Sequence, residues 1–244
     1  MPTTENKLKT IVLEKNQFID SQLAILEKNF DKIAPGILKQ LRALITSGNY
    51  DYNAIRAVFV DAGIDAQLGA FVESYAETIQ YTKMMAEEMG VAFGMSERGL
   101  DLVGKLQEQS VLRLTNTMTP VAQNMVDAAL KWEVDRSPLS KIVAELSVGI
   151  DDLKRRIGTE ALTGISLFES AVKAEQYREA GIERFRYVGP GPSDPVIRDV
   201  CKEVMSNPQN NTTGFTEAEI ADLPVGFVDR GGWNCRHDWI PYVS

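Results

Sequence analysis

The residue types best suited to chemistry gather near the C-terminal end of the chain. The segment 230–244 holds the single histidine, His237, one of the two cysteines, Cys235, and two of the three tryptophans, Trp233 and Trp239. Thiols and imidazoles bind soft metal ions, and a thiol beside an imidazole is an activated nucleophile. This density predicts a specific site in the tail, of a chemical, metal-binding or structural kind.

A zinc site is the first possibility, because Cys201, Cys235 and His237 supply three suitable ligands. Structural zinc sites normally take four protein ligands, and the chain has no C-x-x-C pair. Asp194 or Asp238 would have to supply the fourth. This shortage disfavours zinc, and we expect no metal and no cofactor.

A nucleophilic pair is the second possibility. Cys235 and His237 are two residues apart and would share one face of a strand. The segment lacks a Gly-rich oxyanion stretch and a third orienting group. Asp194 and Arg198, four residues apart across a helix start, fit a cap with an ion pair better than a catalytic pair. No P-loop, dinucleotide, paired-carboxylate or HExxH pattern occurs, and we predict a non-enzymatic protein.

A structural clasp is the third and preferred interpretation, in which Cys201 and Cys235 meet and tie the tail to a short helix. A crosslink over such a loop would contribute about 3–4 kcal/mol. Reduced thiols, as expected in the cytoplasm, would instead act as small buried hydrophobes. Tryptophans here are interpreted as core anchors rather than stacking platforms. The predicted clasp residues are Cys201, Cys235, His237, Trp233, Trp239, Asp194 and Arg198.

The elements that must position this tail begin with residues 1–181, where apolar residues recur at three- and four-residue steps. This period predicts an all-α domain of long amphipathic helices. The first helix is expected at 5–34, where Pro35-Gly36 should break it, and the second at 37–46. Further helices are expected to start near Asp51, Asp65, Ser96, Pro120, Pro138 and Thr159, the last closing at Gly181.

Beyond residue 181 the pattern changes. Residues 182–188 alternate apolar and polar side chains, which indicates a strand. A short helix is expected at 196–205, and Thr216–Glu219 is a capping box for another. Residues 227–243 are typical of loops with short strands. We therefore predict a mainly α fold, with an elongated multi-helix domain at 1–181 followed by a small α+β domain at 182–244.

Composition limits the function classes. The chain has 244 residues, of which 44% are hydrophobic and 25% charged, as in folded soluble proteins. A net charge of −8 disfavours a dedicated nucleic-acid binder, and Lys154–Arg156 is interpreted as a solvated helix face. No run of about 18 apolar residues predicts a membrane span. The first residues lack a signal-peptide layout, so we expect a product that stays in the cytoplasm where it is made.

Several short motifs stand in the order found in one protein family. They are Phe185–Pro190, Ser193-Asp194, Arg198, Cys201, Phe215–Ile220 and Gly231–Pro241, preceded by a helix over 159–182. The series resembles the C-terminal domain of phage minor head proteins, the head-morphogenesis family typified by the F protein of phage Mu. The resemblance covers about residues 155–244. Residues 193–198 depart from it, being less rich in Arg and Thr.

The resemblance implies which assembly the protein belongs to, and it implies no chemical reaction. It implies a virion component of a tailed phage, assembled in the host cytoplasm, that associates in several copies with the portal and other head proteins. We therefore expect a minor capsid protein that acts in head morphogenesis at the portal vertex through protein–protein contacts. The alternatives are an internal head protein ejected with DNA, a Cys/His-dependent hydrolase, and a DNA-binding factor whose contact with DNA would be weak.

Overall fold

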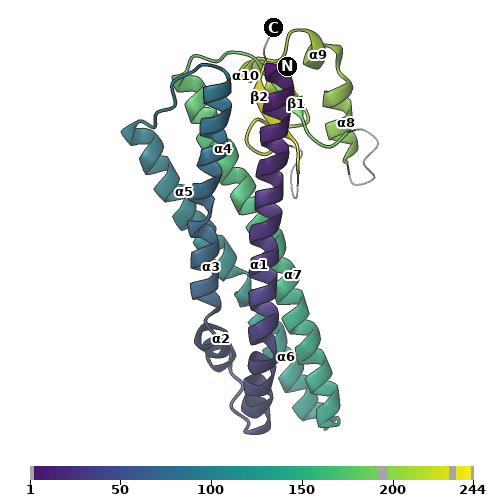
Figure 1. Ribbon diagram of the computed structural model, residues 1–244. Coiled ribbons are helices and arrows are strands. Elements are labelled where there is room, and N and C mark those ends of the chain that lie inside the picture. The colour runs from purple at the N-terminus through teal and green to yellow at the C-terminus, as the bar shows by residue number, and fades with distance from the viewer. Residues whose placement is uncertain (1–2, 192–196, 231–234, 243–244) are drawn as a thin grey trace. The chain divides into compact units, whose positions relative to one another are not determined.

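The computed structural model describes residues 3–191, 197–230 and 235–242, and it confirms a mainly α chain with a small α+β region near the C-terminus (Figure 1). The helices are α1 (Thr4–Thr46), α2 (Tyr52–Asp61), α3 (Ile64–Glu73), α4 (Tyr75–Glu88), α5 (Glu97–Asn116), α6 (Met118–Asp135), α7 (Leu139–Glu179), α8 (Asp199–Ser206), α9 (Pro208–Thr212) and α10 (Glu217–Ala221). The strands are β1 (Phe185–Val188) and β2 (Asp238–Pro241).

The chain divides into two compact units, and α1, α5 and α7 contribute to both. Unit 1 comprises Met1–Asp20, Ser74–Gln107 and Leu162–Ser244, and unit 2 comprises Ser21–Glu73 and Glu108–Ala161. Helices of this length, about 65 Å for α1 at 1.5 Å per residue, extend beyond a single core. The residue 181/182 boundary of the predicted domains is not a boundary between these units, since the small sheet groups with helical residues in unit 1.

The predicted break at Pro35-Gly36 is wrong, because α1 continues through it with Pro35 inside the helix. A proline there removes one backbone hydrogen bond. Phe30, Ile37, Leu41 and Ile45 are all buried at helical spacing across the proline. Each such side chain contributes about 1.5–3 kcal/mol when fully buried, which offsets the lost bond.

The predicted helix start at Thr159 is also wrong, because α7 is one helix of 41 residues. Leu153, Ile157 and Ala161 are buried at four-residue steps, so the apolar face runs past this point without interruption. The Thr159 hydroxyl donates to Arg155 O at 3.0 Å. That bond within the helix takes the place of the cap that the sequence predicts.

Several other helix limits follow the local signals. Asp51 caps α2 by accepting from Ala54 N at 2.9 Å. Thr216 and Glu219 form the predicted capping box of α10. Gly181 follows α7 with a φ of 67°, a left-handed conformation that glycine adopts without strain. The stretch predicted as one helix from Asp65 is α3 and α4, separated by Ser74.

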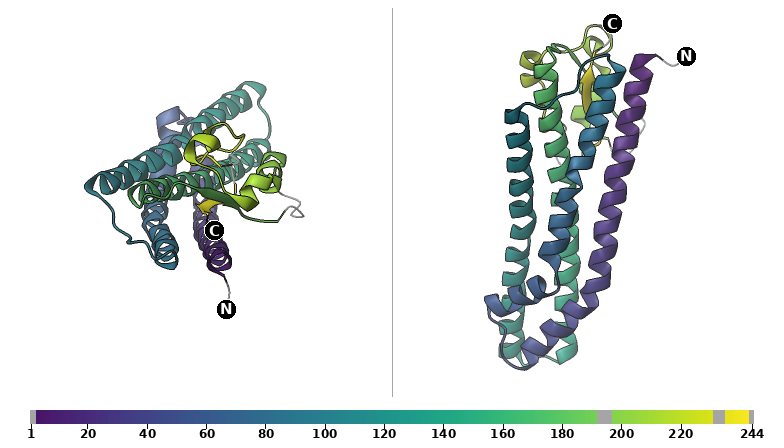
Figure 2. Two further views of the ribbon diagram at one scale, coloured as in Figure 1. Left: turned by 90° about the horizontal axis from the view of Figure 1, so that it is seen from above. Right: turned by 60° about the vertical axis from the view of Figure 1, so that its left-hand side comes forward.

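Aromatic contacts join the helical parts of unit 1. Tyr75 of α4 packs on Phe168 of α7 with ring centroids 5.4 Å apart, and Phe18 of α1 packs on Tyr81 of α4 at 5.9 Å. The N-terminal part of α1, α4 and the C-terminal part of α7 therefore lie side by side, as Figure 2 shows.

The sheet of unit 1 is antiparallel, with Phe185 opposite Pro241 and Tyr187 opposite Trp239. Phe185 also bridges to Phe215. A two-stranded sheet is only marginally stable by itself, so it depends on packing. Its core comprises Tyr177, Phe185, Tyr187, Ile197, Cys201, Val204, Phe215, Ile220, Val225, Cys235 and Trp239.

In unit 2, α2 packs against α6 and α3. Met125 of α6 contacts Gly149 of α7 so closely that a Cβ atom at position 149 would lie 2.7 Å from the Met125 Cε atom.

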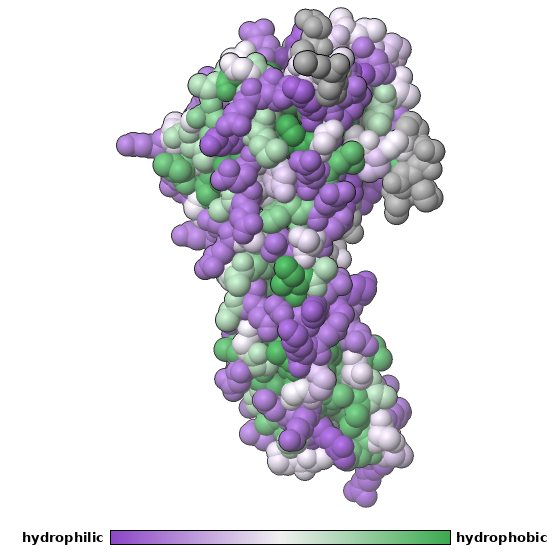
Figure 3. All heavy atoms as spheres, in the orientation of Figure 1, coloured by the Kyte–Doolittle hydropathy of each residue, from purple (hydrophilic) through white to green (hydrophobic). Residues whose placement is uncertain are grey.

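Hydrophilic residues cover most of the face seen in Figure 3, and hydrophobic ones reach it in small groups. Among the described residues, no helix is long and apolar enough to cross a bilayer.

Candidate functional site

Cys201 and Cys235 lie side by side in unit 1. Cys201 is in the first turn of α8, and Cys235 lies three residues before β2. Their Sγ atoms are 4.0 Å apart, no disulfide joins them, and their exposed fractions are 1% and 7%. The structure thus brings together the two thiols of the predicted clasp, while a covalent crosslink between them stays a prediction.

His237, the residue before β2, is the third member of this group. Its Nδ1 atom lies 3.7 Å from Cys235 Sγ, and its Nε2 atom lies 3.3 Å from Pro190 O. A carbonyl oxygen only accepts, so Nε2 carries the proton that it donates. In the neutral ring the Nδ1 lone pair then points toward the sulfur atoms. His237 is 3% exposed, so this contact is enclosed.

Tyr187 of β1 is a member of the site that the sequence analysis missed. Its hydroxyl lies 3.5 Å from Cys201 Sγ and 3.4 Å from Cys235 Sγ. Its ring stacks on His237 with centroids 5.2 Å apart and an interplanar angle of 14°. Burial raises the pKa of Tyr187 far above its ordinary value of 10.0, so the phenol keeps its proton.

A hydrogen bond links the two cysteines and shifts their pKa values in opposite directions. Their mutual hydrogen bond raises the pKa of Cys201, and burial adds to the effect. The same hydrogen bond lowers the pKa of Cys235, against the effect of burial, and hydrogen bonds from Tyr187 and from the His237 backbone N–H lower it further. Cys201 therefore donates and Cys235 accepts, which makes Cys235 the more thiolate-like sulfur.

Gly189 allows β1 to end directly against the imidazole. A Cβ atom at this position would lie 2.5 Å from His237 Cδ2 and 2.8 Å from His237 Cα. A Cβ atom essentially never makes non-bonded contacts this short, so any side chain at 189 would displace His237. Glycine is required here by close approach rather than by backbone dihedrals.

Trp239 is fully buried, as the core-anchor interpretation expects. Its indole Nε1 donates to Gly226 O at 3.0 Å. Its ring contacts Tyr187 at a centroid distance of 4.8 Å and Phe215 at 5.8 Å. Buried tryptophans with a satisfied N–H are typical anchors of a small core.

Of the remaining predicted residues, the structure describes Arg198. Arg198 is the N-cap residue of α8 and makes no side-chain capping bond. Asp194 and Trp233 lie outside the described residues, and so does any ion pair between Asp194 and Arg198.

Five buried charged residues lie next to this site, and the sequence analysis missed all of them except Asp238. They are Lys15 of α1, Glu169 and Lys173 of α7, Arg230 of the tail loop and Asp238 of β2. Both lysines pair with Asp238, and both lie 3.1 Å from a Glu169 oxygen. Asp238, a candidate fourth zinc ligand on sequence grounds, is therefore engaged by cations instead.

Arg230 links this ion cluster, defined by Lys15, Glu169, Lys173, Arg230 and Asp238, to the site. Its guanidinium donates to Glu169 Oε2 and to His237 O, both at 2.9 Å, and to Ser166 O at 2.5 Å. Arg230 has a φ of 50°, in the left-handed region that non-glycine residues seldom adopt. The backbone is thus held in a strained form that brings the guanidinium onto α7.

A signal for this cluster is present in the sequence. Lys15 falls between Val12 and Ile19 on the apolar face of α1. Glu169 and Lys173 are four residues apart on a buried stretch of α7. Charges that interrupt an apolar helical face are rarely buried unless they are paired, so these positions predict partners elsewhere in the chain.

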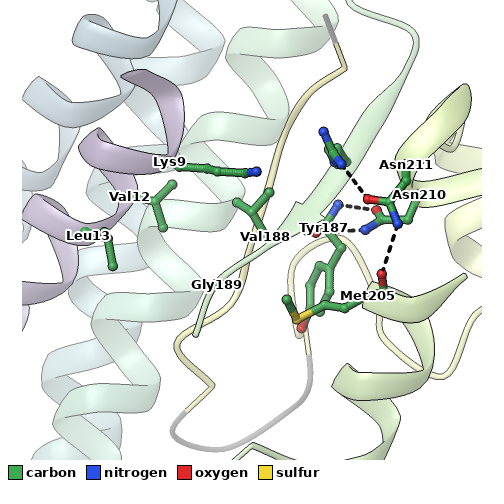
Figure 4. A pocket seen from close by; sticks show the side chains of 10 residues that line it. Lys9, Val12, Leu13, Tyr187, Val188, Gly189, Met205, Asn210 and Asn211 are labelled. Carbon is green, nitrogen blue, oxygen red and sulfur yellow. Dashed lines mark hydrogen bonds between the residues drawn. The ribbon is translucent and has the colours of Figure 1, made fainter. Parts of the chain in front are cut away.

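A cavity of about 270 Å³ lies beside the site, between α1 and β1 (Figure 4). It is lined by Lys9, Val12, Leu13, Arg186, Tyr187, Val188, Gly189, Met205, Asn210 and Asn211. Asn210 closes one edge of β1, since its Nδ2 donates to Tyr187 O at 3.0 Å and its Oδ1 accepts from Tyr187 N at 2.7 Å. Cys201, Cys235 and His237 are not among the residues that line this cavity.

Comparison with family models, curated proteins and solved structures finds no match to this chain. The site must therefore be judged by its own geometry. A thiolate nucleophile acts on substrates that reach it, whereas Cys201, Cys235 and His237 are each less than a tenth exposed. This arrangement is suited to holding the fold together or to binding an ion.

Proposed function

We propose that the chain is a non-enzymatic structural protein of a tailed-phage head, acting in head morphogenesis through protein–protein contacts at the portal vertex. The observation that carries the proposal is the convergence of the motif residues. Phe185, Tyr187, Cys201, Phe215 and Trp239, which are far apart in sequence, belong to one buried core.

This convergence favours a structural explanation of the motif series. Residues that recur together because they build a core need to be buried and in mutual contact, and these are. Residues that recur because they act on a substrate need access to it. The resemblance to phage minor head proteins then supplies the setting in which such a domain works.

The helical surfaces are consistent with assembly through protein contacts. Leu130 and Val134 of α6 are exposed and stand one turn apart, so they adjoin on one helix face. Exposed apolar pairs on an amphipathic helix suit a groove on a partner protein. Glutamate and aspartate outnumber lysine and arginine by 34 to 26, so basic partner surfaces are favoured.

Mass spectrometry of particles purified from a lysate of the host is the direct test. We expect the protein in mature particles at a few copies, and crosslinked to the portal protein after treatment with a short crosslinker. Its absence from purified particles would overturn the proposal.

A second comparison separates the alternatives. An ejected internal protein would be present in full particles and missing from particles that have released their DNA, whereas a portal-vertex component stays in both. A hydrolase would tolerate Cys235→Ser in assembly but lose infectivity. Under the proposal, Cys235→Ser lowers the yield of assembled particles because it weakens the core.

A further inference from the structure

We propose that Cys201, Cys235 and His237 bind a Zn²⁺ ion, with the Tyr187 hydroxyl closing the fourth side of the site. The inference goes beyond the proposed function, because it concerns the isolated protein and holds whatever assembly the chain joins.

The distances between the donor atoms carry the first step. Zinc bonds of about 2.3 Å to sulfur and about 2.0–2.1 Å to nitrogen place tetrahedral ligand atoms roughly 3.6–3.8 Å apart. The Cys201 and Cys235 sulfurs are 4.0 Å apart, and Cys235 Sγ is 3.7 Å from His237 Nδ1. All three donor atoms lie within 4.8 Å of one another. Small side-chain movements therefore suffice for an ion to sit between them.

The hydrogen bond at the far side of the imidazole carries the second step. Histidines that bind metals almost always donate their other ring N–H to a carboxylate, a carbonyl or water. His237 Nε2 meets Pro190 O at 3.3 Å, which leaves Nδ1 as the nitrogen that faces the sulfurs. Stacking on Tyr187 and the close approach of Gly189 hold the ring in this orientation.

Tyr187 answers the ligand shortage that counted against zinc in the sequence. Its hydroxyl lies 3.5 and 3.4 Å from the two sulfurs, about the separation of an oxygen and a sulfur around one zinc ion. The oxygen of the neutral phenol faces the ion from this side and excludes water. The Tyr187 ring is itself fixed between His237 and Trp239.

Charge balance fits a divalent cation, and the donor types favour zinc. Two thiolates and a neutral imidazole around Zn²⁺ sum to zero, as an enclosed site requires. Any proton that the thiols hold leaves for solvent when the ion binds. Sulfur and imidazole donors favour zinc over magnesium or calcium, which prefer oxygen.

A disulfide fits the same residues less well. Sulfurs 4.0 Å apart would have to approach to about 2.05 Å, and an oxidant would have to accept two electrons. A disulfide would also leave the His237 Nδ1 atom, which faces Cys235, without a role. Zinc engages all three groups close to their present positions.

The test measures metal on the purified full-length chain. Protein made in zinc-supplemented medium and purified under reducing conditions without chelators is expected to hold about one zinc per chain by elemental analysis. Cys201→Ser, Cys235→Ser and His237→Ala should each weaken zinc affinity at least tenfold. Tyr187→Phe should also weaken it, because it removes the oxygen on the fourth side of the site.

Val204→Ala is the matched control, because Val204 is buried in the same core on α8 but offers no donor atom. It should keep the full zinc content while losing stability. Cobalt titration of the wild-type chain avoids any variant that fails to fold. It should give thiolate-to-cobalt charge-transfer absorption and the intense visible bands of a tetrahedral site.

Two results would overturn the proposal. One is a folded, reduced wild-type chain with no zinc and no cobalt absorption. The other is a native protein whose Cys201 and Cys235 peptides are recovered crosslinked. Neither result bears on whether the chain is found in phage particles, so failure here is distinguishable from failure of the proposed function.

Discussion

Arg230 Nη2 and Glu169 Oε2 lie 2.9 Å apart with both side chains enclosed, so the loop before β2 is tied to α7 by a buried ion pair. The Glu169 carboxylate also forms ion pairs with Lys15 and Lys173, and Asp238 forms ion pairs with the same two lysines. Residues from α1, α7 and the tail are thus joined at one point. Removing one partner from such a network leaves an unpaired charge, which is what makes the cluster testable.

Asp238→Asn should destabilise the protein by about 3–5 kcal/mol, because it leaves three buried cations with one carboxylate. The free energy of unfolding from urea denaturation measures the change. Asp20→Asn is the control, since Asp20 pairs with Arg236 near the surface. Exposed pairs contribute at most about 1 kcal/mol. Equal, small effects of the two changes would contradict the central role of Asp238.

Stability should fall as the pH is lowered below about 4.5. Burial acts to raise the pKa values of Glu169 and Asp238, and the negative charge of Asp238 adds to this effect on Glu169. The positive charges of Lys15, Lys173 and Arg230 outweigh these effects, so both pKa values are lowered. The unfolded carboxyls take up protons near their ordinary values of 4.5 and 3.8, while the folded ones do not. The unfolded state therefore binds more protons as the pH falls, and it gains relative stability. Urea denaturation between pH 3 and neutrality, compared with Asp238→Asn, measures this slope; an equal slope in the variant would argue against it.

Asn210→Ala should cost about 2–4 kcal/mol, because it leaves the backbone N–H and C=O of Tyr187 buried without their present partners. Asn211→Ala is the neighbouring control, since Asn211 is exposed and its side-chain oxygen accepts a hydrogen bond from Arg186 at the surface. We expect a change of about 0.5 kcal/mol or less there. Thermal or urea unfolding distinguishes the two, and comparable losses would mean that Asn210 does not act through β1.

Gly189→Ala should destabilise the protein by about 1–3 kcal/mol and move the imidazole, because the added Cβ would overlap His237. The histidine ring resonances in a heteronuclear NMR spectrum report that movement. Gly226→Ala is the control, with 3.9 Å between the new Cβ and Asp229. If the His237 signals are the same in Gly189→Ala and the wild type, the close contact is not present in solution.

Pro35→Ala should raise the free energy of unfolding by up to about 3 kcal/mol, because it restores a hydrogen bond inside α1. Pro208→Ala is the comparison. Pro208 occupies the first turn of α9, where the backbone N–H has no partner in the helix. Its replacement should have little effect. A loss of stability in Pro35→Ala would indicate that the chain needs a bend at this position.

Local sequence was sufficient for much of the fold. Asp51 and the Thr216–Glu219 pair act on backbone groups within three residues, so their roles follow from spacing alone. Pro35 and Thr159 misled for the same reason. Each is a local stop or start signal, and burial of an apolar face that continues on both sides overrides it.

The sequence by itself determined the helical periods, most caps, the strand at β1 and the concentration of Cys235, His237 and Trp239 in the tail. These depend on neighbours along the chain. Only the tertiary structure decided that Tyr187 stands over both thiols, and that Lys15 meets Asp238 across 223 positions of sequence. Contacts of that kind carry no fixed spacing, because they depend on how separate helices and strands pack against one another.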